Sequence, residues 1–141
     1  MYTIAVDFDG TLVTDAFPDI TKAKPNYVIL LQLLDRVNQI RENGYKDVKL
    51  ILWTCREDLP EGNYLTDAID YCKEVLCLEF DAINENPPEV SFKSRKVVAD
   101  MYIDDRAYMP TTDFYKFVKN IVSMDNYQLI ESPIFTTKKE E

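Results

Sequence analysis

Residues 2–12 read YTIAVDFDGTL, and this stretch decides the fold. Its apolar, β-branched first half predicts a buried strand over about Thr3 to Phe8. Asp7 and Asp9 are spaced i and i+2, so in a strand their side chains point to the same side. Gly10 then permits a sharp turn. Two like charges held together beside an apolar strand are costly unless a cation lies between them. An Asp-Gly hairpin turn after an edge strand is the alternative interpretation.

The composition limits the classes of function. The chain has 141 residues, enough for one domain with a sizeable core. Its net charge of −9 argues against tight nucleic-acid binding, which needs a basic surface. The absence of histidine excludes histidine acid–base chemistry and histidine metal ligands. The three cysteines lack metal-like spacing, no signal peptide precedes the first strand, and no apolar run is long enough to span a membrane. We therefore expect a cytoplasmic protein.

Beyond the first strand, helical and extended patterns alternate. The expected elements are a helix over 26–43 ended by Gly44, a strand over 48–53, a helix over 65–76, a strand over 80–83, a brief helix over 92–99, a strand over 101–103 and a last helix over 113–122. This order predicts an α/β fold with a parallel sheet between helices. We expect a single domain over residues 1–130 and a tail over 131–141 that is loose at its tip.

Polar residues follow the predicted strands at their carboxyl ends, where parallel sheets bind ligands. They are Asp7 and Asp9 after the first strand, Thr54 after the second, and Asp104 and Asp105 after the fourth, with Lys93 and Lys96 just before the fourth. Carboxylates, a hydroxyl and an ammonium group at one edge of a sheet suit Mg²⁺ and a phosphoryl group. The pattern predicts a phosphate-handling magnesium site.

These residues also carry a family resemblance. Residues 7–12, DFDGTL, resemble motif I of the haloacid dehalogenase (HAD) superfamily of phosphohydrolases. Residues 52–54, LWT, resemble motif II, and residues 103–105, IDD, resemble the acidic motif IV, while Lys96 or Lys93 takes the place of motif III. The resemblance implies a HAD-like Rossmannoid three-layer α/β/α sandwich with a mainly parallel sheet.

The resemblance also implies roles for the acidic residues. Asp7 would be the nucleophile that takes the phosphoryl group as an aspartyl-phosphate. Asp9 would be the general acid that protonates the leaving oxygen and then the base that activates water. Mg²⁺ would be held by a carboxylate oxygen of Asp7, the backbone carbonyl of Asp9 and Asp104, with Asp105 supporting the metal or its waters. The acid at Asp9 favours phosphatase over dehalogenase chemistry.

Phosphate binding is expected from residues beside these acids: Gly10, Thr54, the Cys55 N–H, Arg56 and Lys96. Lys96 is preferred over Lys93 as the catalytic lysine, and the other is then a solvated lysine. Cys55 is expected to be a small buried residue rather than a nucleophile. For Arg56, a surface salt bridge is the alternative to a contact with substrate.

The spacing between motifs bears on substrate size. Residues 13–26 and 84–91 are too few to hold a cap domain, so the chain resembles the capless branch, which includes the phosphatase half of polynucleotide kinase-phosphatases. Residues 94–100 resemble a segment of 5′(3′)-deoxyribonucleotidases, which favours a nucleotide-like substrate or a nucleic-acid end. An open site needs a bulky substrate, a small flap from residues 13–24 or a partner subunit to exclude water, which leaves a homo-oligomer open.

The expected function is a Mg²⁺-dependent phosphatase, that is, a phosphomonoester hydrolase, whose phosphorylated substrate the sequence does not identify. One alternative is a catalytically silent HAD scaffold used for binding or assembly. Another is a receiver-like phosphoacceptor, although the available aspartate, Asp81, lies at the start of its strand.

Overall fold

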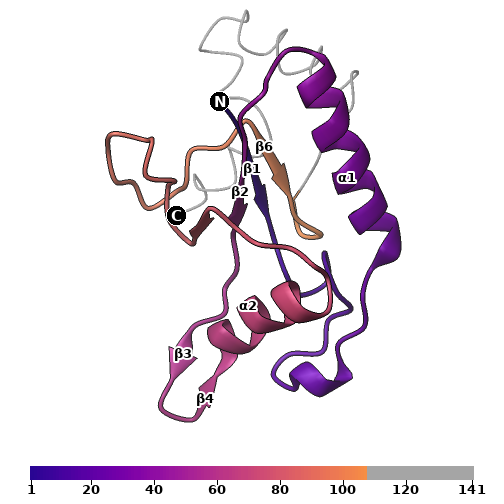
Figure 1. Cartoon of the computed structure of the whole chain (residues 1–141). Helices are drawn as coiled ribbons and strands as arrows, with labels where there is room; N and C mark the ends of the chain where they lie inside the picture. Colours follow the sequence, from indigo (N-terminus) through magenta and orange to yellow (C-terminus); the bar gives the residue numbers. More distant parts are fainter. Residues whose placement is uncertain (108–141) are drawn as a thin grey trace, which may run out of the picture. The chain divides into compact units, whose positions relative to one another are not determined.

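A computed structural model describes residues 1–107, which contain a four-stranded sheet in which every strand pair is parallel. The strand order is β5-β2-β1-β6 (Figure 1). The strands are β1 (Tyr2–Val6), β2 (Val48–Leu52), β5 (Ala82–Ile83) and β6 (Met101–Ile103). The helices are η1, a 3₁₀ turn (Ile20–Lys22), α1 (Tyr27–Glu42) and α2 (Tyr64–Glu74). A separate hairpin is formed by β3 (Asp58–Leu59) and β4 (Gly62–Asn63).

Strand β1 lies in the centre of the sheet, and its register aligns the strand ends. Val6 pairs with Leu52 of β2 and with Ile103 of β6, so these three strands end at the same level. The predicted α/β fold with a parallel sheet is confirmed. The first strand ends at Val6 rather than Phe8, because the chain begins to turn at Asp7.

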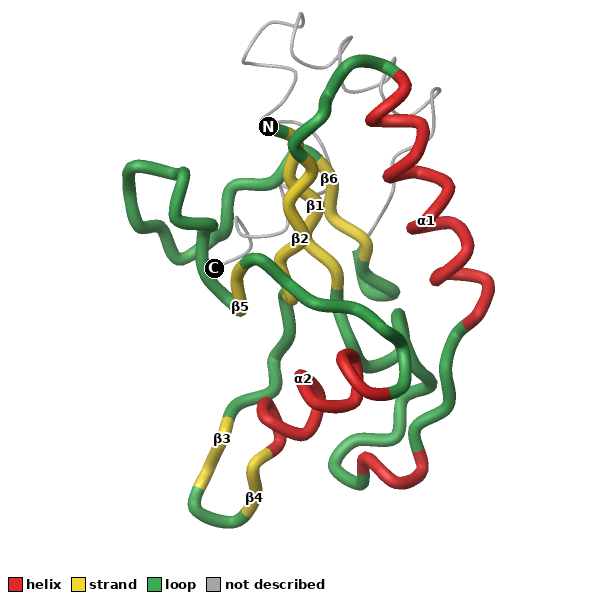
Figure 2. The backbone as a smooth tube through the Cα atoms, in the orientation of Figure 1, coloured by secondary structure: helices red, strands yellow, loops and turns green. Residues whose placement is uncertain are grey.

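Alternation along β1 divides the apolar residues between the two faces of the sheet. Ile4 and Val6 pack in one core cluster with apolar residues of α1 and α2, and Figure 2 shows α1 alongside the sheet and α2 near the carboxyl ends of the strands. Ala5 faces the other way and packs with Ile51, Ala82 and Val97. Within residues 1–107, the second face is covered by the irregular segment between β5 and β6 rather than by a helix.

The brief helix expected over 92–99 is therefore wrong. The Asn86 side chain accepts a hydrogen bond from the Val98 N–H at 2.7 Å and donates to the Ser94 hydroxyl at 3.0 Å. The Ser94 hydroxyl donates in turn to the Lys96 carbonyl at 2.6 Å. Side chains thus occupy backbone groups that a helix would have paired, which is how Asn and Ser compete with helices. The predicted helix 113–122 and tail 131–141 lie outside the described residues.

Helix α1 follows its predicted boundaries closely. The Asn26 side chain accepts a hydrogen bond from the Ile29 N–H at the start, and Gly44, with φ +100°, follows the last turn. None of the helices within residues 1–107 combines the length and apolar character that crossing a bilayer requires.

Asp100 holds the amino end of β1 through two hydrogen bonds to Thr3. Its carboxylate accepts a hydrogen bond from the Thr3 N–H at 2.8 Å, and its own N–H donates to the Thr3 carbonyl at 2.9 Å. Thr3 is buried, so we expect Asp100→Ala to lower the free energy of unfolding by about 1–2 kcal/mol by leaving that N–H unpaired. Asp100→Asn keeps an acceptor oxygen and should lose less than half of this in urea unfolding. Equal losses in the two variants would contradict the explanation.

Candidate functional site

Three carboxylates meet where β1 and β6 end. Asp7 directly follows β1, and its N–H donates to the Ile103 carbonyl at 2.9 Å, which extends the pairing with β6 by one bond. Asp104 and Asp105 directly follow β6. One oxygen from each of Asp7, Asp104 and Asp105 lies within 4.8 Å of the others. We call these residues the acidic cluster.

Thr11 connects two members of the acidic cluster. Its side chain is buried, and the hydroxyl lies 3.3 Å from Asp7 Oδ2 and 3.4 Å from Asp105 Oδ1. The same hydroxyl accepts the Asp105 N–H at 3.0 Å. Thr11 is not among the residues that the sequence predicts for the site, although its place directly after the Asp-Gly turn is a signal that a hydroxyl lies beside the carboxylates.

Gly10 is required at its position for two reasons. Its φ is +79°, in the left-handed region that side chains disfavour. A Cβ on Gly10 would also lie 2.5 Å from Asp105 Oδ2, so a side chain would displace that carboxylate. The turn after Asp9 therefore serves to bring the backbone against the acidic cluster.

The acidic cluster is electrostatically strained without a cation. Burial, the neighbouring charge of Asp104, and the hydrogen bond and charge of Asp105 together raise the pKa of Asp7 to about 7, against the lowering effect of the Phe8 N–H. Hard carboxylate oxygens in this number are the donors that Mg²⁺ prefers, and a divalent cation would remove the repulsion. The residues present therefore fit a divalent metal.

Asp9 is paired with Arg56 and is not a member of the acidic cluster. Arg56 Nε donates to Asp9 Oδ2 at 2.7 Å, and Arg56 Nη2 donates to Asp9 Oδ1 at 2.8 Å. Arg56 is only 2% exposed, so this is a buried ion pair rather than the surface salt bridge considered as an alternative. Both residues were candidates for the site, and the structure joins them to each other.

The turn after β2 places Thr54 and Cys55 at the same edge of the sheet. The Thr54 hydroxyl accepts a hydrogen bond from the Arg56 N–H at 3.2 Å, which leaves its own proton for another acceptor. The Thr54 N–H donates to Asn84 Oδ1 at 2.8 Å. Within residues 1–107, the Cys55 N–H has no hydrogen-bond acceptor. A group that binds a phosphate oxygen must be free in this way. The expectation that Cys55 is buried is wrong, because the strand has ended and its thiol is exposed.

Asn84 is a second residue without a predicted role. It follows β5 with φ +51°, a left-handed conformation that Asn tolerates, and its side chain orients the turn that carries Thr54. A short polar residue at the carboxyl end of a strand was the available signal.

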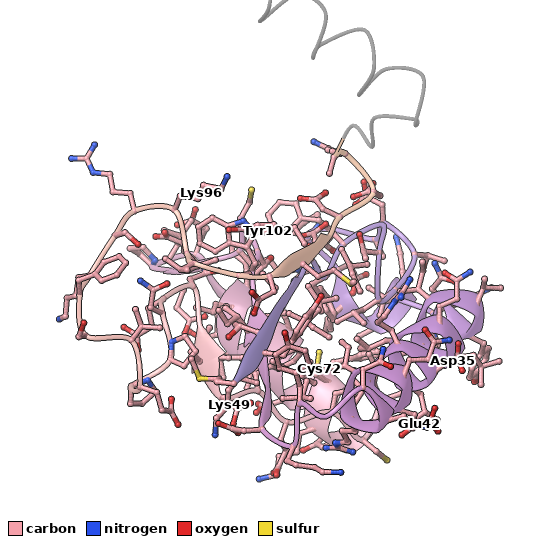
Figure 3. The ribbon with its side chains drawn as sticks, turned by 90° about the horizontal axis from the view of Figure 1, so that it is seen from above. Asp35, Glu42, Lys49, Cys72, Lys96 and Tyr102 are labelled. Atoms are coloured by element: carbon pink, nitrogen blue, oxygen red, sulfur yellow. The ribbon has the colours of Figure 1, made fainter. Side chains whose placement is uncertain are left out.

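Neither candidate lysine is paired with the acidic cluster among the described residues. The Lys96 ammonium lies 5.1 Å from the centroid of the Tyr102 ring, and Figure 3 shows the two side chains next to each other. Lys93 is exposed in the segment between β5 and β6. The assignment of Lys96 as the catalytic lysine stays a prediction.

The comparison with solved structures finds a relative. A conserved protein from Bacteroides thetaiotaomicron is 37% identical in sequence, with a TM-score of 0.54, and the match covers 92% of this chain and 97% of that one. The chain belongs to the same family as this Bacteroides protein. No protein-family model and no curated protein matches the chain significantly. At this sequence identity and TM-score, the two proteins share the α/β fold.

Gly10 and Gly44 form a matched pair of test positions. Both have positive φ, but a Cβ on Gly44 meets nothing within 4 Å. We expect Gly44→Ala to lower the free energy of unfolding by about 1 kcal/mol and Gly10→Ala by about 2–4 kcal/mol, since only the latter adds a collision to the backbone strain. Gly10→Ala should also weaken Mg²⁺ binding, measured by calorimetry, whereas Gly44→Ala should not. Equal effects would show that Asp105 moves aside freely.

The pKa of Asp7 predicts a pH dependence of stability. Because the folded chain raises this pKa from 3.8 to about 7, folded Asp7 holds its proton more tightly than unfolded Asp7. The favourable contribution of the protonated form is present below about pH 4 and is lost as pH rises to about 7. The measurement compares the free energy of unfolding of Asp7→Asn with that of wild type in EDTA. The difference in favour of Asp7→Asn should be about 1–2 kcal/mol larger at pH 8 than at pH 4, a figure already reduced for solvent screening. Parallel pH curves for the two proteins would contradict this.

Proposed function

We propose that this protein is a Mg²⁺-dependent phosphatase of the HAD type that works through an aspartyl-phosphate on Asp7. The observation that carries the proposal is the acidic cluster at the carboxyl ends of β1 and β6, built by residues that match motifs I and IV in order. Thr54, which ends the segment that resembles motif II, and the Cys55 N–H follow the neighbouring strand β2. Hard oxygen ligands beside neutral phosphate donors suit phosphoryl transfer.

The proposed reaction has two steps. A carboxylate oxygen of Asp7 attacks phosphorus as the bond from phosphorus to the substrate oxygen breaks, and that oxygen takes a proton from Asp9. Water then gives a proton to Asp9 and attacks phosphorus, which releases inorganic phosphate and restores the Asp7 carboxylate. The net change is hydrolysis of one phosphomonoester bond, and both acids return to their starting states.

Mg²⁺ would be held by Asp7, Asp104 and the Asp9 carbonyl, with Asp105 supporting it or its waters, and when bound it would neutralise charge on the phosphoryl oxygens. Thr11 would keep Asp7 and Asp105 in place through its shared hydroxyl. The Thr54 hydroxyl and the Cys55 N–H would bind phosphate oxygens.

The substrate proposal is a phosphorylated compound of nucleotide-like size or a nucleic-acid end. The connections that follow β1 and β5 in residues 1–107 hold no inserted domain above the acidic cluster. A large substrate could therefore reach Asp7 without a cap opening. The net charge of −9 is compatible with a small or end-bound substrate and disfavours extended contact with a nucleic-acid backbone.

A catalytically silent scaffold is the second candidate function. It is favoured by the position of Lys96, whose ammonium lies 5.1 Å from the centroid of the Tyr102 ring. A receiver-like phosphoacceptor has less support, because Asp81 accepts the Leu50 N–H at 2.8 Å before β5 begins.

The decisive test is phosphate release from para-nitrophenyl phosphate by wild type and Asp7→Asn, with and without Mg²⁺. We expect Mg²⁺-dependent turnover in wild type and a loss of at least about 10³-fold in the variant, because the nucleophile is removed. Asp35→Asn is the matched control, since Asp35 lies on α1 and bonds to Gln39 (Figure 3). Turnover that survives in Asp7→Asn would overturn the mechanism. Mg²⁺ binding without turnover on a panel of nucleotides and oligonucleotide ends would favour the scaffold.

A further inference from the structure

The Arg56–Asp9 ion pair is enclosed by aromatic rings. The guanidinium carbon of Arg56 lies 5.1 Å from the centroid of the Phe8 ring and 5.1 Å from that of Phe17. Phe8 is fully buried, whereas Phe17 is 53% exposed and packs against Tyr64 at 5.2 Å between centroids. The ion pair therefore lies between the core and one exposed ring of the 13–25 connection.

Arg56 is held by groups from several elements. Its Nη1 donates to the Tyr64 carbonyl at the start of α2, at 3.2 Å, and its backbone N–H donates to the Thr54 hydroxyl at 3.2 Å. A buried, bidentate guanidinium with aromatic contacts is costly to move, because its partner would be left as an unpaired charge. Arg56 thus fixes the position of the Asp9 carboxylate.

This arrangement separates Asp9 from the acidic cluster. Asp7 and Asp9 are two residues apart, and the negative charge of a fourth carboxylate would be drawn to any cation bound at the acidic cluster. A carboxylate bound to a divalent cation holds a proton only weakly, whereas one that accepts a single N–H bond on each oxygen keeps a second lone pair on each for proton exchange. In the structure both Asp9 oxygens bond to Arg56 instead, while the Asp9 side chain keeps 20% exposure for contact with a reacting group.

We propose that Arg56 is a positioning residue that keeps the Asp9 carboxylate out of the metal's ligand set and so reserves it for proton transfer. The inference rests on the proposed function, because it concerns the acid and base of that reaction. Phe17 covers the ion pair from the solvent side, which makes the 13–25 connection part of the same arrangement.

The test compares Arg56→Lys with wild type. Lysine keeps the charge but cannot form the two-pronged bond, so Asp9 is released without a change in net charge. Mg²⁺ affinity, measured by calorimetry, should rise about 3- to 10-fold in Arg56→Lys, and the gain should vanish in the Asp9→Asn background. A purely structural role would weaken Mg²⁺ binding instead, through loss of order in the turn that holds Thr54.

A second readout is the dependence of rate on the leaving group. Para-nitrophenolate leaves without a general acid, whereas the alkoxide of ethyl phosphate needs one. Arg56→Lys should therefore lose at least about ten-fold more kcat on ethyl phosphate than on para-nitrophenyl phosphate. A uniform loss on both substrates would overturn the positioning role.

Phe17→Ala provides a variant that keeps both charges and removes only an exposed ring. It should shift Mg²⁺ affinity and the leaving-group ratio in the same directions as Arg56→Lys, by smaller factors. Phe92→Ala is the matched control, since Phe92 is 56% exposed and lies in the segment between β5 and β6. Unchanged or weaker Mg²⁺ binding in both Arg56→Lys and Phe17→Ala, with turnover in wild type intact, would overturn this inference alone. Absence of Mg²⁺ binding and of turnover in wild type would instead overturn the proposed function on which it rests.

Discussion

Repulsion among carboxylates is the constraint on which the site depends. Parallel pairing of β1 with both β2 and β6 aligns the strand ends, and this brings Asp7 within reach of Asp104 and Asp105. Burial first, and then the neighbouring Asp104 and Asp105, raise the pKa of Asp7 to about 7. Ile4, Ala5 and Val6 of β1 are buried on the two faces of the sheet, so the strand cannot shift to move the carboxylates apart.

Two sets of neighbouring residues limit the repulsion among these carboxylates. Thr11 and the close backbone approach at Gly10 hold the acidic cluster together from one side. Arg56 neutralises Asp9 separately and keeps this fourth acid apart. The division between the acidic cluster and an acid paired with arginine is thus an electrostatic consequence of four aspartates at one edge of a sheet.

The family relationship supports this picture at the level of the fold. The Bacteroides relative matches most of both chains, so its α/β architecture and that of this protein are shared. The chemistry of the site remains a proposal that rests on the residues themselves. Their nature and positions fit a HAD-type phosphatase better than a receiver-like domain, because the acids that converge follow the first and last described strands.

The sequence alone determined the parallel α/β fold, the order of the four sheet strands and of α1 and α2 along the chain, and the acidic residues at the strand ends. Apolar periodicity and short polar residues after strands are local signals, and local signals decide these features. Only the tertiary structure decided that Asp9 pairs with Arg56, that Asn84 supports Thr54, and that the segment before β6 is not helical. The first two depend on partners 47 and 30 residues away in the chain. The third depends on Asn86 and Ser94 side chains that bond to their own segment in place of a helix, and apolar spacing does not encode any of these contacts.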